Sequence, residues 1–352
     1  MELQQVNVEI AGRRIGAGQP PYVVAELSAN HGGSLDRALG VMEAAKAAGA
    51  DAIKLQTYTA DTITIDYDGP DFRIQGGLWD GRRLYELYEE AHTPWDWHAA
   101  LFAKGRELGI PVFSTPFDVS AVDFLEGFDL PAYKIASFEL IDLPLVRRIA
   151  ATGKPVIMST GMASPEEITE SVETFRAAGG GSLVLLHCVS GYPTPVEQAN
   201  LRRIPRLATE FGCPVGLSDH TLGIDVAIAS VALGACLVEK HFTLRRADGG
   251  PDSSFSLEPN ELRALVRGTK AVFDALGTGA PARAPVEKGS MAFRRSIYVV
   301  RDVGAGESFT ADNVRIIRPG FGLAPRELPK ILGRKARRAL ARGTALTWDA
   351  VE

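Results

Sequence analysis

Cysteine is scarce in this chain of 352 residues, which contains Cys188, Cys213 and Cys236 and no others. None of the three forms a CxxC pair, and each lies in or beside an apolar, strand-like segment. An odd number of unpaired cysteines does not indicate a disulfide framework. We therefore interpret all three as buried thiols, which behave as small apolar side chains.

Long hydrophobic runs and an excess of positive charge are also missing. No uninterrupted apolar run approaches the length of a membrane span, and the first residues, MELQQVNVEIAGRR, lack the basic-then-apolar pattern of a signal peptide. The formal net charge of -5 provides no overall basic field. We therefore expect neither a membrane nor nucleic acid as a partner, and we expect a cytoplasmic location.

Short apolar segments alternate with helix-like segments eight times along most of the chain. The segments are rich in Val, Ile and Leu on both faces, as a buried parallel sheet requires. The predicted strands are Tyr22–Ala25, Ala52–Ile53, Val112–Ser114, Ala132–Ile135, Val156–Met158, Leu183–Leu186, Val215–Leu217 and Cys236–Val238. Eight strand–helix units over about 250 residues predict an α/β fold, a (β/α)8 TIM barrel. A doubly wound open sheet is the alternative, but the first turn lacks the GxGxxG of such sheets.

Helix signals separate these strands. Leu35–Ala48 is followed by the stop signal Gly49, and Pro94–Leu108 is preceded by Thr93, a candidate N-cap. Glu258–Leu276 is predicted as the closing helix. The segment Thr57–Asp80 is too long and too polar for an ordinary connection between two elements, so it is predicted to be an insert.

The composition changes after the closing helix. GTGAPARAP resembles a linker, and a compact basic segment follows it. We predict a catalytic barrel with a short N-terminal hairpin over 1–276, a linker over 277–289 and a small domain over 290–352. In the small domain we predict a strand at Ser296–Val300 and a capped turn of helix at Thr310–Val314.

Polar residues follow every predicted strand, at the edge where the active site of a barrel lies. They include Glu26, Lys54, Gln56, Thr115, Lys134, Ser137, Glu139, Ser159, His187, Ser218, Asp219, His220, Glu239 and His241. Charged residues inside apolar strands are costly unless they are paired or bind a ligand. Two lysines with several hydroxyls indicate a phosphate or carboxylate site, although one lysine could instead form a structural ion pair.

His220 and His241 follow neighbouring strands and suit a divalent metal with open coordination positions. Two histidines alone bind weakly, so substrate oxygens and water would complete the coordination. The alternative is that each histidine satisfies a turn. Asp219 and Glu239 are expected to orient the imidazoles or to act as bases. We interpret His187 as a hydrogen-bonding core residue.

An ordered set of motifs runs along nearly the whole chain: AELSANHGGSLDRAL, DAIKLQTYTADTITID, FSTPFD, YKIASFEL, STGMAS, YPTP, GLSDHT, VEKHFT and GPDSSFSLEP. This set resembles the sialic acid synthases, which condense phosphoenolpyruvate with an N-acetylated amino sugar. The tail RRSIYVVRDVGAGESFTADNVRIIRPGFGL resembles the antifreeze-like (SAF, β-clip) domain of those enzymes. GLWDGRRLYELYEEAHTPWDWH and RPGFGLAP are similar to pseudaminic acid synthases within the family. Ser190 and Ser253 depart from the Asn and His common in N-acetylneuraminate synthases.

The resemblance implies a role for each matching residue. It implies that phosphoenolpyruvate is bound by Lys54, Thr115, Lys134, Ser137 and Ser218. For the sugar it implies Gln56, Tyr192, Asp252 and an arginine, Arg294 or Arg295, from the partner in a domain-swapped homodimer. For a divalent metal, Mn²⁺ or else Mg²⁺ or Co²⁺, it implies His220 and His241. For the reacting centre it implies Glu26, Glu139 and Glu239.

The implied reaction joins phosphoenolpyruvate, 2,4-diacetamido-2,4,6-trideoxy-L-altrose and water to give pseudaminic acid and phosphate. Use of N-acetylmannosamine or a legionaminic-type diacetamido sugar is the alternative of the same chemistry. A non-catalytic carbohydrate-binding or ice-binding protein is the alternative of another class, and a metal hydrolase on the same barrel is a third.

Overall fold

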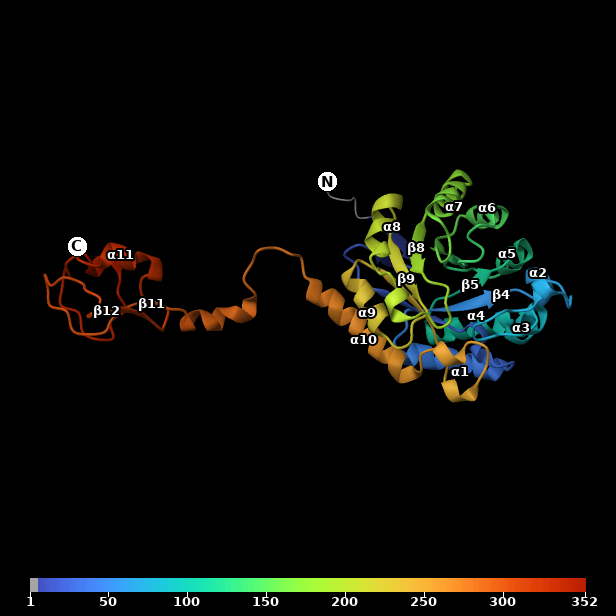
Figure 1. Ribbon diagram of the computed structural model, residues 1–352, viewed down its shortest axis with the longest axis horizontal. Helices are drawn as coiled ribbons and strands as arrows, with labels where there is room; N and C mark the ends of the chain where they lie inside the picture. The colour runs from blue at the N-terminus through green and yellow to red at the C-terminus, as the bar shows by residue number, and fades with distance from the viewer. Residues whose placement is uncertain (1–5) are drawn as a thin grey trace. The chain divides into compact units, whose positions relative to one another are not determined.

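Eight parallel strands form a closed barrel in the computed structural model, which describes residues 6–352 (Figure 1). The strands pair in chain order, and the last, β10, pairs with the first, β3. Their bounds are β3 (Tyr22–Glu26), β4 (Ala52–Thr57), β5 (Val112–Pro116), β6 (Tyr133–Ile135), β7 (Val156–Ser159), β8 (Leu183–Cys188), β9 (Val215–Asp219) and β10 (Leu237–His241). The prediction of a (β/α)8 barrel is confirmed.

Helices surround this barrel, as Figure 1 shows, and pack on the outward faces of the strands. Their bounds are α1 (Leu35–Ala48), α2 (Ala60–Ile63), α3 (Leu84–Ala91), α4 (His98–Leu108), α5 (Val119–Leu125), α6 (Leu143–Ala150), α7 (Pro165–Ala177), α8 (Arg203–Phe211), α9 (Asp225–Ala232) and α10 (Pro259–Leu276). Helix α1 has the predicted bounds because Ser34 caps its start and Gly49, in the left-handed conformation, ends it.

Two local predictions are corrected. Strand β10 continues past Val238 through three polar residues to His241, because Glu239 and Lys240 find buried ion-pair partners. Helix α4 does not start at Pro94, since a separate 3₁₀ turn covers Trp95–Trp97. The hydroxyl of Thr93 is buried without a hydrogen-bond partner in the described part of the chain, so Thr93 is not a cap.

A hairpin closes one end of the barrel. It consists of β1 (Asn7–Ile10) and β2 (Arg13–Gly16), as the predicted N-terminal hairpin requires. Residues 1–5 lie outside the described part of the chain. Val8, Ile10 and Ile15 form one buried cluster with inward-facing side chains of the barrel strands. The functional site is thereby confined to the opposite end, where the strands finish.

The chain divides into two compact units, Met1–Gly277 and Thr278–Glu352. The second unit has its own apolar core, which includes Ile297, Phe309 and Leu346. Its regular elements are β11 (Ser296–Val299), paired antiparallel with β12 (Val314–Ile317), and α11 (Leu328–Ile331). The predicted capped turn at Thr310–Val314 is present as a single turn, in which the N–H of Val314 donates to Thr310 O at 3.1 Å and the N–H of Asp312 donates to Thr310 Oγ1 at 3.3 Å. Val314 then begins a strand.

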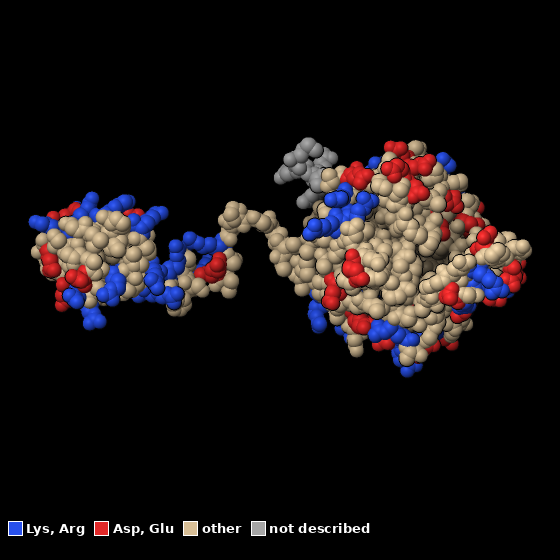
Figure 2. All heavy atoms as spheres, viewed as in Figure 1, with Lys and Arg blue, Asp and Glu red and all other residues tan. Residues whose placement is uncertain are grey.

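Basic side chains gather around the second unit, as Figure 2 shows. Most of the arginines there are exposed, Arg294 and Arg295 among them. No helix among residues 6–352 is long and apolar enough to span a bilayer.

Candidate active site

The parallel register brings the polar strand ends together. His241 of β10 lies opposite Glu26 of β3, and Glu26 lies opposite Lys54 of β4. On the other side of β10, Glu239 lies opposite Ser218 of β9. Residues that are far apart in the sequence thus become neighbours at one edge of the barrel, as expected for the carboxyl ends of parallel strands.

Lys54 lies between two carboxylates. Its Nζ is 2.8 Å from Glu26 Oε2 and 2.9 Å from Glu239 Oε1, and all three side chains are at most 5% exposed. Lys134 Nζ lies 3.9 Å from Glu239 Oε1. Burial lowers the pKa of Lys54 to about 8, although the Glu239 carboxylate acts in the opposite direction. Buried charges of this kind persist only when they are paired or bind a ligand.

Hydroxyls and a backbone N–H surround the second lysine. Lys134 Nζ donates to Ser159 Oγ at 2.7 Å, and the N–H of Gly161 donates to Ser137 Oγ at 3.1 Å. A Cβ at Gly161 would lie 2.4 Å from Ser190 Oγ and 2.7 Å from Ser137 Oγ. Only glycine therefore allows the backbone to approach so closely. Ammonium groups, hydroxyls and an N–H together suit a phosphate or carboxylate anion.

The imidazoles of His220 and His241 face each other, with ring centroids 5.5 Å apart. His220 Nδ1 lies 3.0 Å from Val189 O and donates to it, so its Nε2 is directed elsewhere. His241 Nδ1 is buried without a hydrogen-bond partner among residues 6–352. Burial lowers the pKa of His241 well below 6.5, which favours the neutral ring that a metal requires.

These two rings fit a divalent cation with an incomplete protein shell. Among the described residues, no group of three or more His, Cys, Asp or Glu side chains is placed to hold a metal. Water and substrate oxygens would therefore supply the remaining ligands, as a Lewis-acid site requires.

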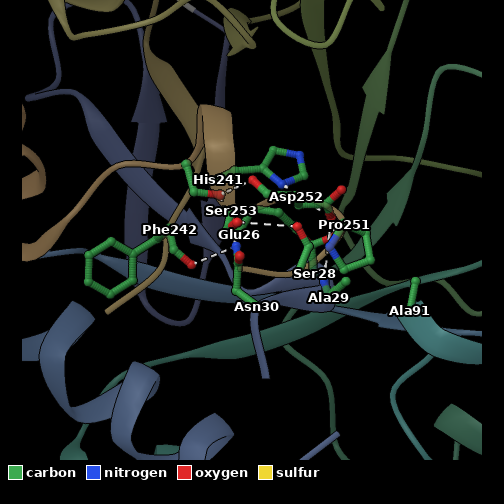
Figure 3. Close-up of polar contacts among 12 residues, drawn as sticks. Glu26, Ser28, Ala29, Asn30, Ala91, His241, Phe242, Pro251, Asp252 and Ser253 are labelled. Atoms are coloured by element: carbon green, nitrogen blue, oxygen red, sulfur yellow. Dashed lines mark hydrogen bonds and ion pairs between the residues drawn. The ribbon is translucent and has the colours of Figure 1, made fainter. Parts of the chain in front are cut away.

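Asp252 connects the loop after β10 to the loop after β3, as Figure 3 shows. Its carboxylate accepts a short hydrogen bond from Ser28 Oγ and a longer one, 3.5 Å, from the N–H of Ala29. Its Oδ2 also lies 3.8 Å from His241 Nδ1. Ser28 has a φ of 44°, which is unfavourable for a residue with a Cβ, and such backbone conformations concentrate at functional sites.

These groups line a cavity of about 520 Å³. The lining includes predicted site residues, namely Lys54, Gln56, Lys134, Ser137, Glu139, Tyr192, Ser218, His220, Glu239, His241 and Asp252. Residues of the insert and of α3 also line it, namely Tyr58, Ile63, Ile74, Trp79, Leu84, Leu87 and Tyr88. The cavity is large enough for two small substrates side by side.

Four predicted site residues do not line this cavity. Glu26 is fully buried behind Lys54, and Thr115 is fully buried on β5, where it is opposite Gln56. Arg294 and Arg295 belong to the second unit. His187 is a core residue as interpreted, because its Nε2 lies 2.8 Å from Ala199 O in the interior.

The expectation for Asp219 is wrong. Its carboxylate pairs with Lys240 Nζ at 2.7 Å and accepts from the N–H of Thr221 at 3.0 Å. It therefore neutralises a buried lysine and holds a turn, and it contacts neither imidazole. The alternation of side chains along β9 and β10 gives the reason, since Asp219 and Lys240 point to the same outer face.

Sequence reasoning missed several residues of the cavity. Cys188 was interpreted only as a buried thiol, yet its Sγ lies 3.8 Å from His220 Nδ1. Burial raises the pKa of this thiol, but His220, Ser137 and Lys134 together outweigh that effect and bring the pKa to about 7. Its position at the end of β8 was the available signal. The lining residues of the insert were missed because a long insert gives no periodic pattern from which to place its side chains.

Comparisons with known proteins show the family of this chain. The model of the NeuB family matches residues 41–281, and the model of the SAF domain matches residues 294–352. A pseudaminic acid synthase from Campylobacter jejuni is 46% identical, and the match covers 92% of this chain and 95% of the relative. A pseudaminic acid synthase from Helicobacter pylori is 43% identical, and the match covers 95% of this chain and 98% of the relative. An N-acetylneuraminic acid synthetase from Leptospira borgpetersenii, known from a crystal structure, is 32% identical in sequence and superimposes with a TM-score of 0.73. The match covers 82% of this chain and 95% of the other.

Proposed function

The chain belongs to the NeuB family and ends in a SAF domain, and from this premise we propose that it is a pseudaminic acid synthase. It condenses phosphoenolpyruvate with 2,4-diacetamido-2,4,6-trideoxy-L-altrose and water, and it releases pseudaminic acid and phosphate. The observation that carries the proposal is the single cavity in which an anion cradle of two lysines adjoins a pair of histidines.

Lys54 and Lys134 hold the carboxylate and phosphate of phosphoenolpyruvate in this proposal. The hydroxyls of Ser137 and Ser218, both on the cavity wall, donate to the same anion. Thr115 is behind this wall, so its predicted contact would be indirect. Two buried ammonium groups stabilise the negative charge that the departing phosphate carries.

A divalent ion held by His220 and His241, preferably Mn²⁺ and otherwise Mg²⁺ or Co²⁺, would polarise the aldehyde of the open-chain sugar. Gln56, Tyr192 and Asp252 line the cavity and bind the sugar, and Tyr192 and Asp252 lie next to these histidines. The methylene carbon of phosphoenolpyruvate attacks the aldehyde carbon. Water then adds to the resulting oxocarbenium-like centre, and phosphate leaves with cleavage of the C–O bond.

Three carboxyl groups share the proton transfers and the positioning. Glu139 lines the cavity, and burial raises its pKa to about 7, which suits a group that exchanges a proton with water. Glu239 accompanies the lysines and stabilises the cationic centre. Glu26 does not reach the cavity, so it orients Lys54 and acts as a positioning residue.

The second unit completes the enzyme in a domain-swapped homodimer, with Arg294 or Arg295 supplied to the sugar end of the partner's barrel. The predicted division into a barrel over 1–276, a linker over 277–289 and a SAF domain over 290–352 belongs to this proposal, as does a cytoplasmic location. The exposed position of both arginines supports it.

A direct assay tests the reaction. The purified protein is incubated with Mn²⁺, phosphoenolpyruvate and, in turn, the trideoxy-L-altrose sugar, its legionaminic-type isomer and N-acetylmannosamine, and phosphate release is measured. We expect the highest kcat/KM with the first sugar. A higher value with another sugar would assign the chain to that synthase instead. No release with any sugar would contradict the proposal and favour a non-catalytic carbohydrate-binding protein.

The histidine pair has its own test. His220→Ala and His241→Ala should each lower kcat by more than about 100-fold, because Lewis-acid stabilisation contributes several kcal/mol. Mn²⁺ binding, followed by calorimetry, should weaken in parallel. His92→Ala is the control, since His92 does not line the cavity and its ring Nδ1 lies 2.8 Å from Glu89 O on the same helix end. Full turnover in either cavity variant would reject the metal assignment.

A further inference from the structure

The segment after β3 begins with an unfavourable backbone conformation. Ser28 starts the 3₁₀ turn Ser28–His31, is 2% exposed and has a φ of 44°. A Cβ crowds the backbone in this left-handed region, which glycine occupies without such a cost. The backbone alone therefore favours glycine at this position, and the reason for a serine has to come from what its hydroxyl contacts.

The hydroxyl of Ser28 holds one oxygen of the Asp252 carboxylate. Ser28 Oγ donates a short hydrogen bond to Asp252 Oδ2, and the N–H of Ala29 reaches the same oxygen at 3.5 Å. No N–H or O–H of residues 6–352 donates to Asp252 Oδ1. Figure 3 shows these residues beside His241. One carboxylate oxygen is thus bound by the protein, and the other remains for a substrate.

A second anchor from the same segment holds the loop between β10 and α10, which carries Asp252. Asn30 Nδ2 donates to Phe242 O at 3.0 Å and to Ser256 Oγ at 2.9 Å. Ser256 Oγ in turn donates to Asp252 O at 2.7 Å. The backbone of Asp252 is therefore fixed without Ser28, and what the Ser28 hydroxyl adds is the direction of the carboxylate.

We propose that Ser28 is a positioning residue whose hydroxyl fixes the Asp252 carboxylate, so that Oδ1 is ready to accept a hydrogen bond from an amide N–H or a hydroxyl of the sugar. This inference rests on the proposed function, in which Asp252 binds the sugar in the cavity that both residues line. The unfavourable φ of Ser28 is then explained, because a glycine would lack the hydroxyl.

The test separates the hydroxyl from the backbone. Ser28→Ala and Ser28→Gly both remove the hydroxyl, but only Ser28→Ala keeps a Cβ in the left-handed conformation. KM for the sugar should rise by about tenfold in both variants, because a freed carboxylate must be ordered when the sugar binds. Both kcat and the Kd for phosphoenolpyruvate, measured by calorimetry, should change much less.

Stability should follow the Cβ instead of the hydroxyl. In chemical denaturation, the free energy of unfolding should be higher for Ser28→Gly than for Ser28→Ala, because glycine relieves the unfavourable φ. A residue with only a structural role would make KM and stability change together. Two variants with the same KM and different stabilities therefore identify a positioning role.

A matched control and a double-mutant cycle complete the test. Ser120 Oγ donates to Asp118 Oδ2 at 2.6 Å, and neither residue lines the cavity, so Ser120→Ala should keep the wild-type KM for both substrates. In an Asp252→Asn background, Ser28→Ala should raise KM for the sugar by less than it does in the wild type, because the two residues act as a unit.

The outcomes are distinguishable. A wild-type KM for the sugar in both Ser28 variants would overturn the inference. A raised KM in Ser28→Ala alone would assign the effect to the backbone, and additive effects with Asp252→Asn would show that Ser28 acts independently; either result would also overturn it. Absence of turnover by the wild type with every sugar would instead remove the proposed function, and the inference with it.

Discussion

Glu139 and Glu239 line the same cavity but have opposite electrostatic surroundings. Burial raises the pKa of both carboxyls, but Lys134 and Lys54 reverse this effect at Glu239, whose pKa is below its ordinary value. Glu139 has no such close pair, so burial dominates and its pKa is about 7. Two carboxyls whose pKa values are driven apart are a common basis for dividing acid, base and electrostatic roles.

The first prediction concerns Glu139 as the base that accepts a proton from the attacking water. Because its pKa is about 7, kcat/KM should fall as the pH decreases below about 7. Glu139→Gln should lower kcat by about 100-fold or more and remove that limb of the pH profile. Glu197→Gln, at an exposed site, is the control. Persistence of the limb in Glu139→Gln would assign it to another group.

The same group makes a prediction about stability. The carboxyl has a higher pKa in the folded chain than the ordinary 4.5, so the folded state binds its proton more tightly. Below about pH 4.5 both states are protonated and the full stability is present. Between about pH 4.5 and 7 the unfolded state loses this proton while the folded state keeps it, so the free energy of unfolding decreases until the pH passes about 7. Chemical denaturation at pH 6 and pH 8 should therefore show a smaller decrease for Glu139→Gln than for the wild type.

The relative position of two residues was predictable where it follows from the order of the strands. His220 and His241 were identified as a pair because each follows a strand and the two strands are neighbours. Asp219 was misassigned because its partner, Lys240, comes from the adjacent strand. The sequence shows which residues are at the edge, but the identity of each ion-pair partner depends on which face of the strand a side chain occupies.

At the scale of elements, the bounds of α1 agree with the prediction because its stop signal, Gly49, directly follows it. The predicted start of α4 at Pro94 was wrong, because a separate 3₁₀ turn intervenes. Strand ends were less predictable, since β10 was expected to stop before Glu239. Its charged residues remain in the strand because Lys54 and Asp219 neutralise them, and that information comes from other strands.

The loop after β7 provides the next prediction. Gly161→Ala would place a Cβ 2.4 Å from Ser190 Oγ and 2.7 Å from Ser137 Oγ, so one side of the proposed phosphate cradle must move. We expect KM for phosphoenolpyruvate to rise by about tenfold or more, because small displacements of positioning groups are costly. KM for the sugar should change much less, as measured in two-substrate kinetics.

Gly181→Ala is the matched control for this loop. Gly181 precedes β8, and a Cβ there would meet no atom within 4 Å among residues 6–352. It should behave as the wild type does. Equal increases in both KM values for Gly161→Ala would indicate a general distortion of the barrel edge and would contradict a cradle specific to one substrate.

At the scale of the whole molecule, the sequence predicted the barrel and the small domain because each leaves a simple signal. Eight buried strands and a change of composition after Leu276 are both visible without structural information. The sequence contains no comparable pattern that identifies the arginine which we propose the small domain supplies to the sugar site. Its many exposed arginines make a single active residue impossible to identify from charge alone.

The last prediction tests whether an arginine is supplied by the partner subunit. Arg294→Ala and Arg295→Ala are assayed first, and the variant that loses activity is used further. If both variants keep full activity, the proposal is contradicted. Arg326→Ala is the control, since its side chain is 85% exposed and pairs only with its neighbour Glu327. The inactive arginine variant is then mixed with His220→Ala under conditions that allow subunits to exchange.

The two defects should complement each other if the dimer is domain-swapped. In a mixed dimer, the intact barrel of the arginine variant would receive the intact SAF domain of the His220→Ala chain, and the second site would carry both defects. Half of randomly exchanged dimers are mixed and each has one working site, so about one quarter of the wild-type activity should return. If each chain supplied its own arginine, every site would retain a defect, and no activity would return at any mixing ratio.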